Sequence, residues 1–221
     1  MKIAIITGSA KRVGKVIAFA LAQKGYAVVL HYKTSRKEAL HTAAEMKKKG
    51  VPILVVQGDI SREKDVKKMF HAIKKKFGRL DVLVNNAAVF KRTAFEMLTE
   101  KDWDIHLNTN LKGTFLCCRE AAKMMLKQGS GVIINIADYA AVHPYKNYLP
   151  YCISKAGVVA LTKALAQELA PKINVTCISP RIVLWPEDYS NEQKKRILEK
   201  LLRKKMGTPE DVAREIVRLL R

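Results

Sequence analysis

The sequence lacks the features that mark secreted, membrane-spanning and metal-binding proteins. It contains four cysteines, with no CxxC pair and no histidine at zinc-ligand spacing, which favours reduced thiols in a cytoplasm. No apolar run approaches the roughly 18 residues that a membrane span needs, and no early stretch has the pattern of a cleavable leader. We therefore expect a soluble, cytoplasmic protein with no membrane partner and no metal site.

Internal repeats, low-complexity tracts and linkers rich in proline, glycine and serine are also missing. A chain of 221 residues is long enough for one well-buried α/β domain and short for two. We expect a single domain over residues 1–221.

Acidic residues are scarce, because 20 Asp and Glu stand against 41 Lys and Arg, giving a formal net charge of +21. Such an excess can indicate a nucleic-acid or anionic-membrane partner. Many of the lysines, however, alternate with apolar residues at helical period, as in residues 65–78 and 191–205. We interpret them as solvated helix faces and predict no nucleic-acid partner, with a non-catalytic ligand-binding or nucleic-acid-binding protein as the alternative class.

Short apolar runs alternate with amphipathic segments along the chain. Six runs predict strands, at residues 2–6, 27–31, 52–56, 81–85, 132–136 and 173–178. Helical patterns lie near residues 14–24, 36–49, 62–77, 101–127 and 151–169, with two more after 190. Ser61 and Thr99 are candidate N-caps, and Asp102 completes a capping-box pattern with Thr99. The strands are apolar on both faces, so the alternation predicts an α/β, doubly wound Rossmann fold with a mostly parallel sheet.

The end of the first predicted strand carries a glycine turn, "TGSAKRVGK", with Gly8 and Gly14 between strand and helix. Glycines allow a tight turn and a close approach to a pyrophosphate, while the helix N-terminus supplies N–H donors. Arg12 stands where dinucleotide folds often have a glycine, and its guanidinium can reach a phosphate or a planar polar ligand. The pattern predicts a phosphate-binding turn.

The second predicted strand is followed by Lys33, Ser35 and Arg36 and by no acid. An acid there would hold the ribose 2′-hydroxyl of NAD, whereas basic and hydroxyl groups accommodate a 2′-phosphate. We therefore predict NADPH as cofactor, with ordinary surface charge as the alternative for these residues.

The ends of the third and fourth predicted strands carry weaker signals. Asp59 could accept from an adenine amine or cap the next helix, and Asn86 with Ala87 could line the adenine ribose.

The stretch "ADYAAVHPYKNYLPYCISKAG", residues 137–157, places Tyr151 and Lys155 on one helix face, with Asp138 upstream. A phenol with a pKa near 10 needs a neighbouring cation to transfer protons at neutral pH. The spacing predicts a catalytic site.

Together with these motifs, "GDI", "NNAA", Asn110 in "NTNLKG" and "INIAD" give a chain that resembles the short-chain dehydrogenase/reductase family over residues 1–186. The resemblance implies that Tyr151 donates a proton, that Lys155 holds the nicotinamide ribose and lowers the tyrosine pKa, and that Asn110 maintains a water-linked proton path. It also implies a cofactor site made of Gly8, Arg12, Val13, Gly14, His31, Tyr32, Lys33, Ser35, Asp59, Ile60, Asn86, Ala87 and Lys155.

Two replacements make the chain similar to the pteridine reductase branch. Most family members have serine in place of Asp138 and glycine in place of Arg12, and both replacements occur together in pteridine reductases. "LHYKTS" after the second strand, Phe90 and "LWPED" at residues 184–188 fit the same branch. This resemblance implies that NADPH reduces a dihydropterin or dihydrofolate-type substrate, with Asp138 assisting the tyrosine.

Substrate binding by Arg12, Phe90, Tyr151 and Trp185 is implied by the same resemblance. For Phe90 and Trp185 the alternative is core packing, and for Asp138 it is a turn cap. The alternative enzyme is a short-chain carbonyl reductase that acts on a 3-oxoacyl thioester or a sugar ketone.

The chain departs from the family pattern in two places. Arg181 follows Pro180 where a glycine is usual, and the sequence stops before the family's last strand. Family resemblance and a stripe of small residues, Ala156, Ala160 and Ala164, predict a homodimer or homotetramer.

Overall fold

A single parallel sheet forms the centre of the computed structural model, which describes residues 1–185, 189–192, 195, 199 and 206–220. Its six strands lie in the order β3-β2-β1-β4-β5-β6. They are Ile3–Ile6 (β1), Ala27–Tyr32 (β2), Ile53–Gln57 (β3), Val82–Asn85 (β4), Gly131–Ile136 (β5) and Ile173–Ile178 (β6). Every predicted strand is confirmed to within one residue at each end, and so is the doubly wound α/β fold.

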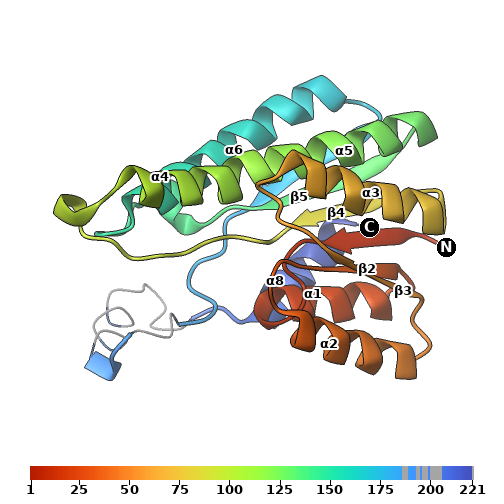
Figure 1. The fold of residues 1–221 in the computed structure, drawn as a ribbon, viewed down its shortest axis with the longest axis horizontal. Coiled ribbons are helices and arrows are strands. Elements are labelled where there is room, and N and C mark those ends of the chain that lie inside the picture. Colours follow the sequence, from red (N-terminus) through yellow and green to blue (C-terminus); the bar gives the residue numbers. More distant parts are fainter. Residues whose placement is uncertain (186–188, 193–194, 196–198, 200–205, 221) are drawn as a thin grey trace.

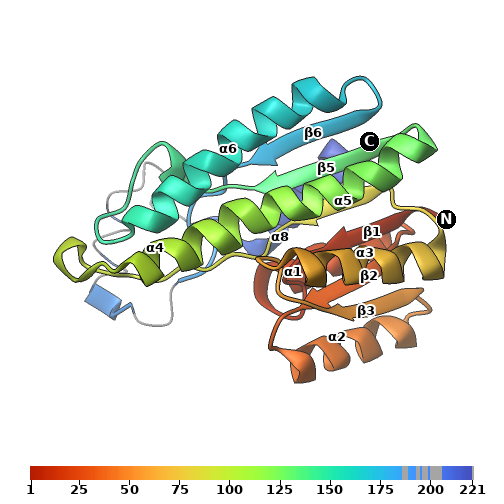
Figure 2. The same ribbon diagram turned by 45° about the horizontal axis from the view of Figure 1, so that its top comes forward.

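Helices cover both faces of the sheet (Figure 1). They are Arg12–Gln23 (α1), Arg36–Lys48 (α2), Glu63–Phe77 (α3), Glu100–His106 (α4), Gly113–Gln128 (α5), Leu149–Leu169 (α6) and Pro209–Leu219 (α8). Helices α1, α2 and α8 lie on one face, and α3, α5 and α6 lie on the other (Figure 2). Of the two helices expected after residue 190, α8 is one, and the other falls largely outside the described residues.

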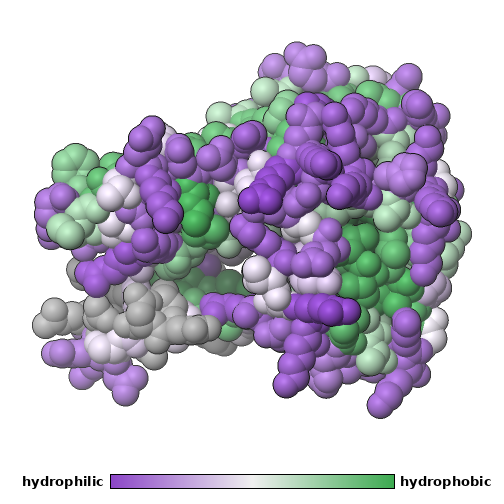
Figure 3. Space-filling view, in the orientation of Figure 1, coloured by the Kyte–Doolittle hydropathy of each residue, from purple (hydrophilic) through white to green (hydrophobic). Residues whose placement is uncertain are grey.

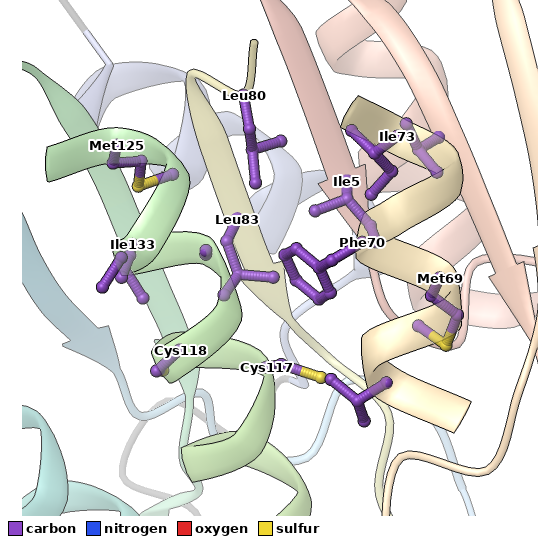
Figure 4. Close-up of a cluster of buried hydrophobic side chains, with 14 of the residues drawn as sticks. Ile5, Met69, Phe70, Ile73, Leu80, Leu83, Cys117, Cys118, Met125 and Ile133 are labelled. Carbon is purple, nitrogen blue, oxygen red and sulfur yellow. The ribbon is translucent and has the colours of Figure 1, made fainter. Parts of the chain in front are cut away.

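Two apolar cores follow from this layering, because alternate side chains of each strand point to opposite faces. Ile5 and Leu83 face α3 and α5, where Phe70, Cys117 and Met125 complete one core (Figure 4). The second core lies between the other face and α1, α2 and α8, and includes Ile6, Leu30, Ile17, Leu21, Met46 and Ile216. The strands are therefore apolar on both faces, as the sequence predicts.

The predicted helix at 101–127 is wrong as a single helix. It begins as α4, passes through a π-helical segment at Leu107–Lys112 (η2), and continues as α5. The capping box of Thr99 and Asp102 is confirmed at the start of α4. Ser61 is not the N-cap of α3, which follows Arg62; the Ser61 hydroxyl donates instead to Asp59 Oδ1 at 2.7 Å.

The lysine-rich helix α3 presents its charges to solvent, while the lysine-rich segment 191–205 lies largely outside the described residues. In α3, Val66, Met69, Phe70 and Ile73 are buried while the intervening lysines are exposed, which confirms the predicted solvated face. Hydrophilic side chains cover much of the face shown in Figure 3. Within the described part of the chain, no helix combines the length and apolar character that crossing a membrane requires.

Candidate active site

A cleft of about 690 Å³ lies beyond the carboxyl ends of β4, β5 and β6. Ligands of doubly wound sheets bind at this edge, where loops from non-adjacent parts of the chain meet. The cleft brings together seven of the predicted site residues, Arg12, Val13, Asn86, Phe90, Asp138, Tyr151 and Lys155.

The acid and the tyrosine meet directly in this cleft. The Tyr151 hydroxyl donates to Asp138 Oδ2 at 2.7 Å. The other carboxylate oxygen, Oδ1, accepts from the backbone N–H of Ala140 at 2.7 Å and from the hydroxyl of Tyr145 at 3.2 Å. Asp138 therefore caps the short 3₁₀ turn Tyr139–Ala141 (η3) with one oxygen and binds the tyrosine with the other.

The carboxylate changes how readily Tyr151 gives up its proton. Burial, the charge of Asp138 and the hydrogen bond to it raise the pKa of Tyr151 well above its ordinary value. The family resemblance implied a lowered tyrosine pKa, and the structure differs first because the phenol is buried and then because an acid, rather than a neutral hydroxyl, faces it. At neutral pH Tyr151 is therefore protonated and able to act as an acid.

Lys155 lies one helical turn beyond Tyr151 on α6, and its ammonium sits 5.8 Å from the centre of the Tyr151 ring. It donates to the carbonyl of Ile136, at the end of β5, at 2.7 Å. Burial lowers the pKa of Lys155 to about 8, while the charge of Asp138 opposes this shift. An ammonium has three N–H groups, and the Ile136 carbonyl accepts from one of them. The others are directed elsewhere and can bind a ligand.

Asn110 occupies the π-helical segment and is 1 % exposed. Its side-chain oxygen accepts from Val89 N at 2.7 Å, and its amide donates to Val89 O at 3.0 Å and to Ser154 Oγ at 2.9 Å. The side chain therefore ties the loop after β4 to α6. The predicted proton path through Asn110 stays a prediction.

The glycine turn after β1 has the shape that a phosphate-binding loop requires. Gly8 has φ +64°, and a Cβ on Gly14 would lie 2.3 Å from the Gly8 carbonyl oxygen. Side chains are excluded at both positions, so the backbone can approach a ligand closely. Asn86 holds this turn, because its amide donates to the carbonyls of Thr7 and Gly8 at 2.8 and 3.1 Å.

Arg12 begins α1 with φ +54°, a left-handed conformation that glycine adopts freely and other residues adopt at a cost. This backbone conformation explains why a glycine is common there. Both Arg12 and its neighbour Val13 line the cleft. The donors and the steric room present on this side of the cleft fit a nicotinamide dinucleotide.

The residues predicted to choose between the two nicotinamide cofactors lie farther along the same edge. Lys33 forms an ion pair with Asp59 at 2.7 Å, so two residues that were each predicted to contact the cofactor contact each other. Ser35 is the N-cap residue of α2, and Tyr32 and Ile60 are buried. The imidazole of His31 is also buried and contacts backbone on both sides. Cofactor contacts by these residues and by Ala87 stay predictions.

Aromatic rings form one wall of the cleft. Phe90 stacks on Tyr148 with ring centres 4.3 Å apart and meets Tyr151 edge-on at 4.6 Å. Phe90 is nevertheless 40 % exposed, so it does not belong to a core. Trp185 lies outside the residues that line the cleft; its ring centre is 6.1 Å from that of Tyr189, which does line it.

Sequence reasoning missed Tyr145, and it noted Arg181 only as a departure. Tyr145, Tyr148 and Tyr151 recur every three residues, a signal that could have marked them as neighbours. Arg181 also lines the cleft, and its guanidinium lies 4.7 Å from the centre of the Tyr139 ring. Among the described residues, no group of three or more His, Cys, Asp and Glu side chains is arranged to hold a metal ion.

The glycine turn, Tyr151 and Lys155 all lie in a stretch of sequence that matches a known family over most of the chain. A family model described as short chain dehydrogenase matches residues 2–196. This chain belongs to the short-chain dehydrogenase family. The predicted family and its oxidoreductase class are thereby confirmed.

Individual short-chain dehydrogenases resemble the chain over nearly its full length. A 3-oxoacyl-[acyl-carrier-protein] reductase FabG of Staphylococcus epidermidis is 34% identical over 218 residues, which cover 97% of this chain and 89% of that protein. A 3-oxoacyl-[acyl-carrier-protein] reductase of Synechocystis sp. is 34% identical over 213 residues (96% and 86%). The (2S)-[(R)-hydroxy(phenyl)methyl]succinyl-CoA dehydrogenase subunit BbsD of Thauera aromatica is 36% identical over 219 residues (98% and 88%).

Proposed function

We propose that this chain is an NADPH-dependent reductase in which Tyr151 protonates the substrate. The observation that carries the proposal is that the hydroxyl of Tyr151 and the ammonium of Lys155 line the same cleft as Arg12 of the glycine turn. When bound, NADPH supplies the hydride. A binding protein without chemistry has no need of a buried tyrosine and lysine on one helix face.

The proton then comes from a phenol that is neutral at physiological pH. Tyr151 gives its proton to the substrate atom that gains negative charge, and Lys155 stabilises the charge left on the phenol. Asp138 orients the hydroxyl through its 2.7 Å hydrogen bond. The raised pKa of Tyr151 means that the phenol holds its proton at neutral pH and gives it up only to a substrate atom on which negative charge develops.

For the substrate, the first candidate is a carbonyl, in particular a 3-oxoacyl thioester. The relatives support this alternative better than the pterin reading, because two of them are named as 3-oxoacyl-[acyl-carrier-protein] reductases and a third as a CoA-linked dehydrogenase. Reduction of such a carbonyl needs one hydride and the one proton that Tyr151 supplies.

A pterin ring is the second candidate, and two features of the cleft favour it. The accessible face of Phe90 beside Tyr148 offers a stacking surface for a flat heterocycle. An acid on the tyrosine also provides a second group able to carry a proton to a ring nitrogen. Neither feature is required by a 3-oxoacyl chain.

The deciding experiment follows loss of NADPH absorbance with an acetoacetyl thioester, dihydrobiopterin, dihydrofolate and folate. We expect turnover of at least one of these substrates, and we expect Tyr151→Phe to abolish it, since that change removes only the donated proton. The rate ratio between thioester and pterins assigns the substrate class. Full activity in Tyr151→Phe would overturn the proposal.

We also propose that residues 1–221 act as one catalytic domain, because both apolar cores lie on the same sheet. A cytoplasmic location stays a prediction. It is consistent with free thiols at all four cysteines, two of which, Cys117 and Cys118, are fully buried.

A further inference from the structure

His31 is the fifth residue of β2, and both of its ring nitrogens form hydrogen bonds with backbone atoms of neighbouring loops. It is 2 % exposed. Its Nδ1 accepts from the backbone N–H of Gly8 at 2.9 Å. Its Nε2 lies 3.0 Å from the carbonyl oxygen of Gly58, just after β3. A backbone N–H can only donate and a carbonyl can only accept, so these partners define a neutral imidazole with its proton on Nε2.

The same residue is joined to the glycine turn through its backbone. The N–H of His31 donates to Ser9 Oγ at 3.0 Å, and the N–H of Ser9 donates to the carbonyl of His31 at 3.0 Å. Gly8 and Ser9 are therefore held against β2 by three hydrogen bonds. The bond from His31 to Gly58 adds the loop that carries Asp59, so one side chain links the loops after β1 and β3.

We propose that neutral His31 is a positioning residue for the nicotinamide cofactor, holding the glycine turn and the loop after β3 at the spacing that the dinucleotide requires. The inference rests on the proposed cofactor and goes beyond it. The imidazole acts through the backbone of Gly8 and Gly58, since its own nitrogens are already used. The role proposed for His31 is therefore indirect, whereas the family resemblance implies a cofactor contact by His31.

Protonation would break this arrangement at one defined bond. An imidazolium carries a proton on Nδ1 as well, which would then face the N–H of Gly8, and two donors cannot bond to each other. Burial lowers the pKa of His31. The charge of Asp59 opposes that shift; the Asp59 carboxylate is itself paired with Lys33, and the backbone N–H of Asp59 donates to Asp65 Oδ2. Strand β1, on the other side of β2, carries no titratable side chain.

The sign of the pH effect follows from these contacts. The pKa of His31 in the folded protein lies below its ordinary value. At neutral pH the imidazole is therefore neutral, and its hydrogen bonds to Gly8 and Gly58 are intact. As the pH falls through that lowered pKa, protonation competes with the bond to Gly8. Cofactor affinity should therefore be constant near neutral pH and decrease in acid.

The test measures dissociation constants of NADP⁺ and NAD⁺ by calorimetry from about pH 8 to about pH 5. NAD⁺ is included because it lacks the 2′-phosphate, a group whose own ionisation falls near pH 6. We expect the parent to lose about tenfold in affinity for NAD⁺ at the acid end, the amount that one backbone hydrogen bond is commonly worth.

Two substitutions separate the two ring nitrogens. In His31→Asn the amide oxygen can take the place of Nδ1 and cannot be protonated, so the acid loss should disappear, while loss of the bond to Gly58 weakens binding at every pH. In His31→Gln the longer side chain places its amide near Gly58, so the bond to Gly8 is lost. This variant should bind the cofactor about tenfold more weakly at every pH.

His106 provides the matched control. It is fully buried as well, with Nδ1 2.7 Å from Asp102 O and Nε2 accepting from Lys91 N at 3.2 Å, but these bonds lie away from the glycine turn. His106→Asn should lower stability and leave the acid dependence of NAD⁺ binding as in the parent. An acid dependence in His31→Asn equal to that of the parent, or its loss in the His106 variant, would overturn the proposal.

A measurement on the parent covers the case in which the variants fail to fold. Nitrogen NMR of the imidazole distinguishes a bare Nδ1 from a protonated one. We expect His31 to show a bare Nδ1 at neutral pH, with and without NADP⁺, and a protonated Nδ1 there would refute the assignment. Absence of dinucleotide binding in every protein, with a bare Nδ1, would instead contradict the proposed function.

Discussion

The Tyr151 hydroxyl lies 2.7 Å from Oδ2 of Asp138, and the Asp138 carboxylate opposes loss of the tyrosine proton. Replacing the acid by a neutral group should reverse that effect. In Asp138→Ser we expect the pH at which NADP⁺ oxidises the product alcohol at half its maximal rate to fall by about one to three units, the usual effect of one adjacent charge. The pH–rate profile of the oxidation measures it.

Tyr145→Phe is the matched control for this change. It removes the 3.2 Å hydrogen bond to Asp138 Oδ1 but keeps the carboxylate, the Ala140 N–H and Tyr151. The midpoint of the profile should move much less than in the serine variant. Equal midpoints in the parent and in Asp138→Ser would mean that the acid does not control Tyr151.

The same serine variant distinguishes the two substrate classes. If Asp138 carries a proton to a pterin ring, Asp138→Ser should lower turnover of dihydropterin about a hundredfold, the contribution of one general acid. Reduction of an acetoacetyl thioester needs only Tyr151 and should fall far less. Asp138→Asn, which keeps the shape and cannot be protonated, should behave like the serine variant. Equal losses on both substrates would remove the argument for pterin.

Cofactor preference should depend on the basic groups near the glycine turn. Changing Arg12, Lys33 and Ser35 together to Gly, Asp and Ala removes three donors and adds a charge that repels a 2′-phosphate. We expect the ratio of NADPH to NADH affinities to fall at least about tenfold, since a charge-assisted hydrogen bond contributes about 1.5 to 3 kcal/mol. Titrating both cofactors by fluorescence measures the ratio.

Arg12→Gly alone is informative because it should not damage the backbone. Arg12 has φ +54°, which glycine adopts without strain, so thermal stability should stay close to that of the parent. A fall in NADPH affinity would then be due to the lost guanidinium. A ratio unchanged in both variants would locate the 2′-phosphate elsewhere.

Asn110 should matter for stability as well as for catalysis. In Asn110→Ala the N–H and carbonyl of Val89 lose their partners, which should lower the free energy of unfolding by about 1 to 3 kcal/mol. Asn108→Ala, in the same π-helical segment but only half-buried, should cost less than about 1 kcal/mol. Urea unfolding compares the two. A smaller loss in Asn110→Ala than in Asn108→Ala would contradict the role given to these bonds.

Exposed apolar side chains on three helices predict that the chain forms an oligomer. Trp103, Ile105, Phe115 and Ile153 on α4, α5 and α6 are each about two-fifths exposed, and they lie on the helices predicted to pair across a twofold axis. We expect at least a dimer by light scattering at micromolar concentration. Ala160→Glu places a charge in the exposed small-residue stripe of α6 and should yield monomers, whereas Glu168→Lys near the end of α6 should not. A monomeric parent would exclude this interface.

The fold could be predicted from the sequence because its strands are apolar on both faces, a pattern with few interpretations. The helix at 101–127 was predicted as continuous, since a helical sequence pattern does not reveal where α-type hydrogen bonds give way to π-type ones. Ser61 was wrong as a cap because Asp59 binds its hydroxyl, a local competition that spacing does not reveal. Tyr145 escaped because it precedes α6, where the three-residue spacing with Tyr148 and Tyr151 does not by itself show that its hydroxyl reaches Asp138.

The π-helical segment at Leu107–Lys112 has a consequence for how this region can change. A π turn holds one residue more than an α turn, so α4 and α5 are out of phase by about a quarter turn of helix. Deleting Lys112, which is exposed, would restore a regular helix and improve its hydrogen bonding. It would also rotate Asn110 away from Val89 and Ser154. The chain thus retains a surplus residue whose removal should give a more regular helix and a less ordered cleft.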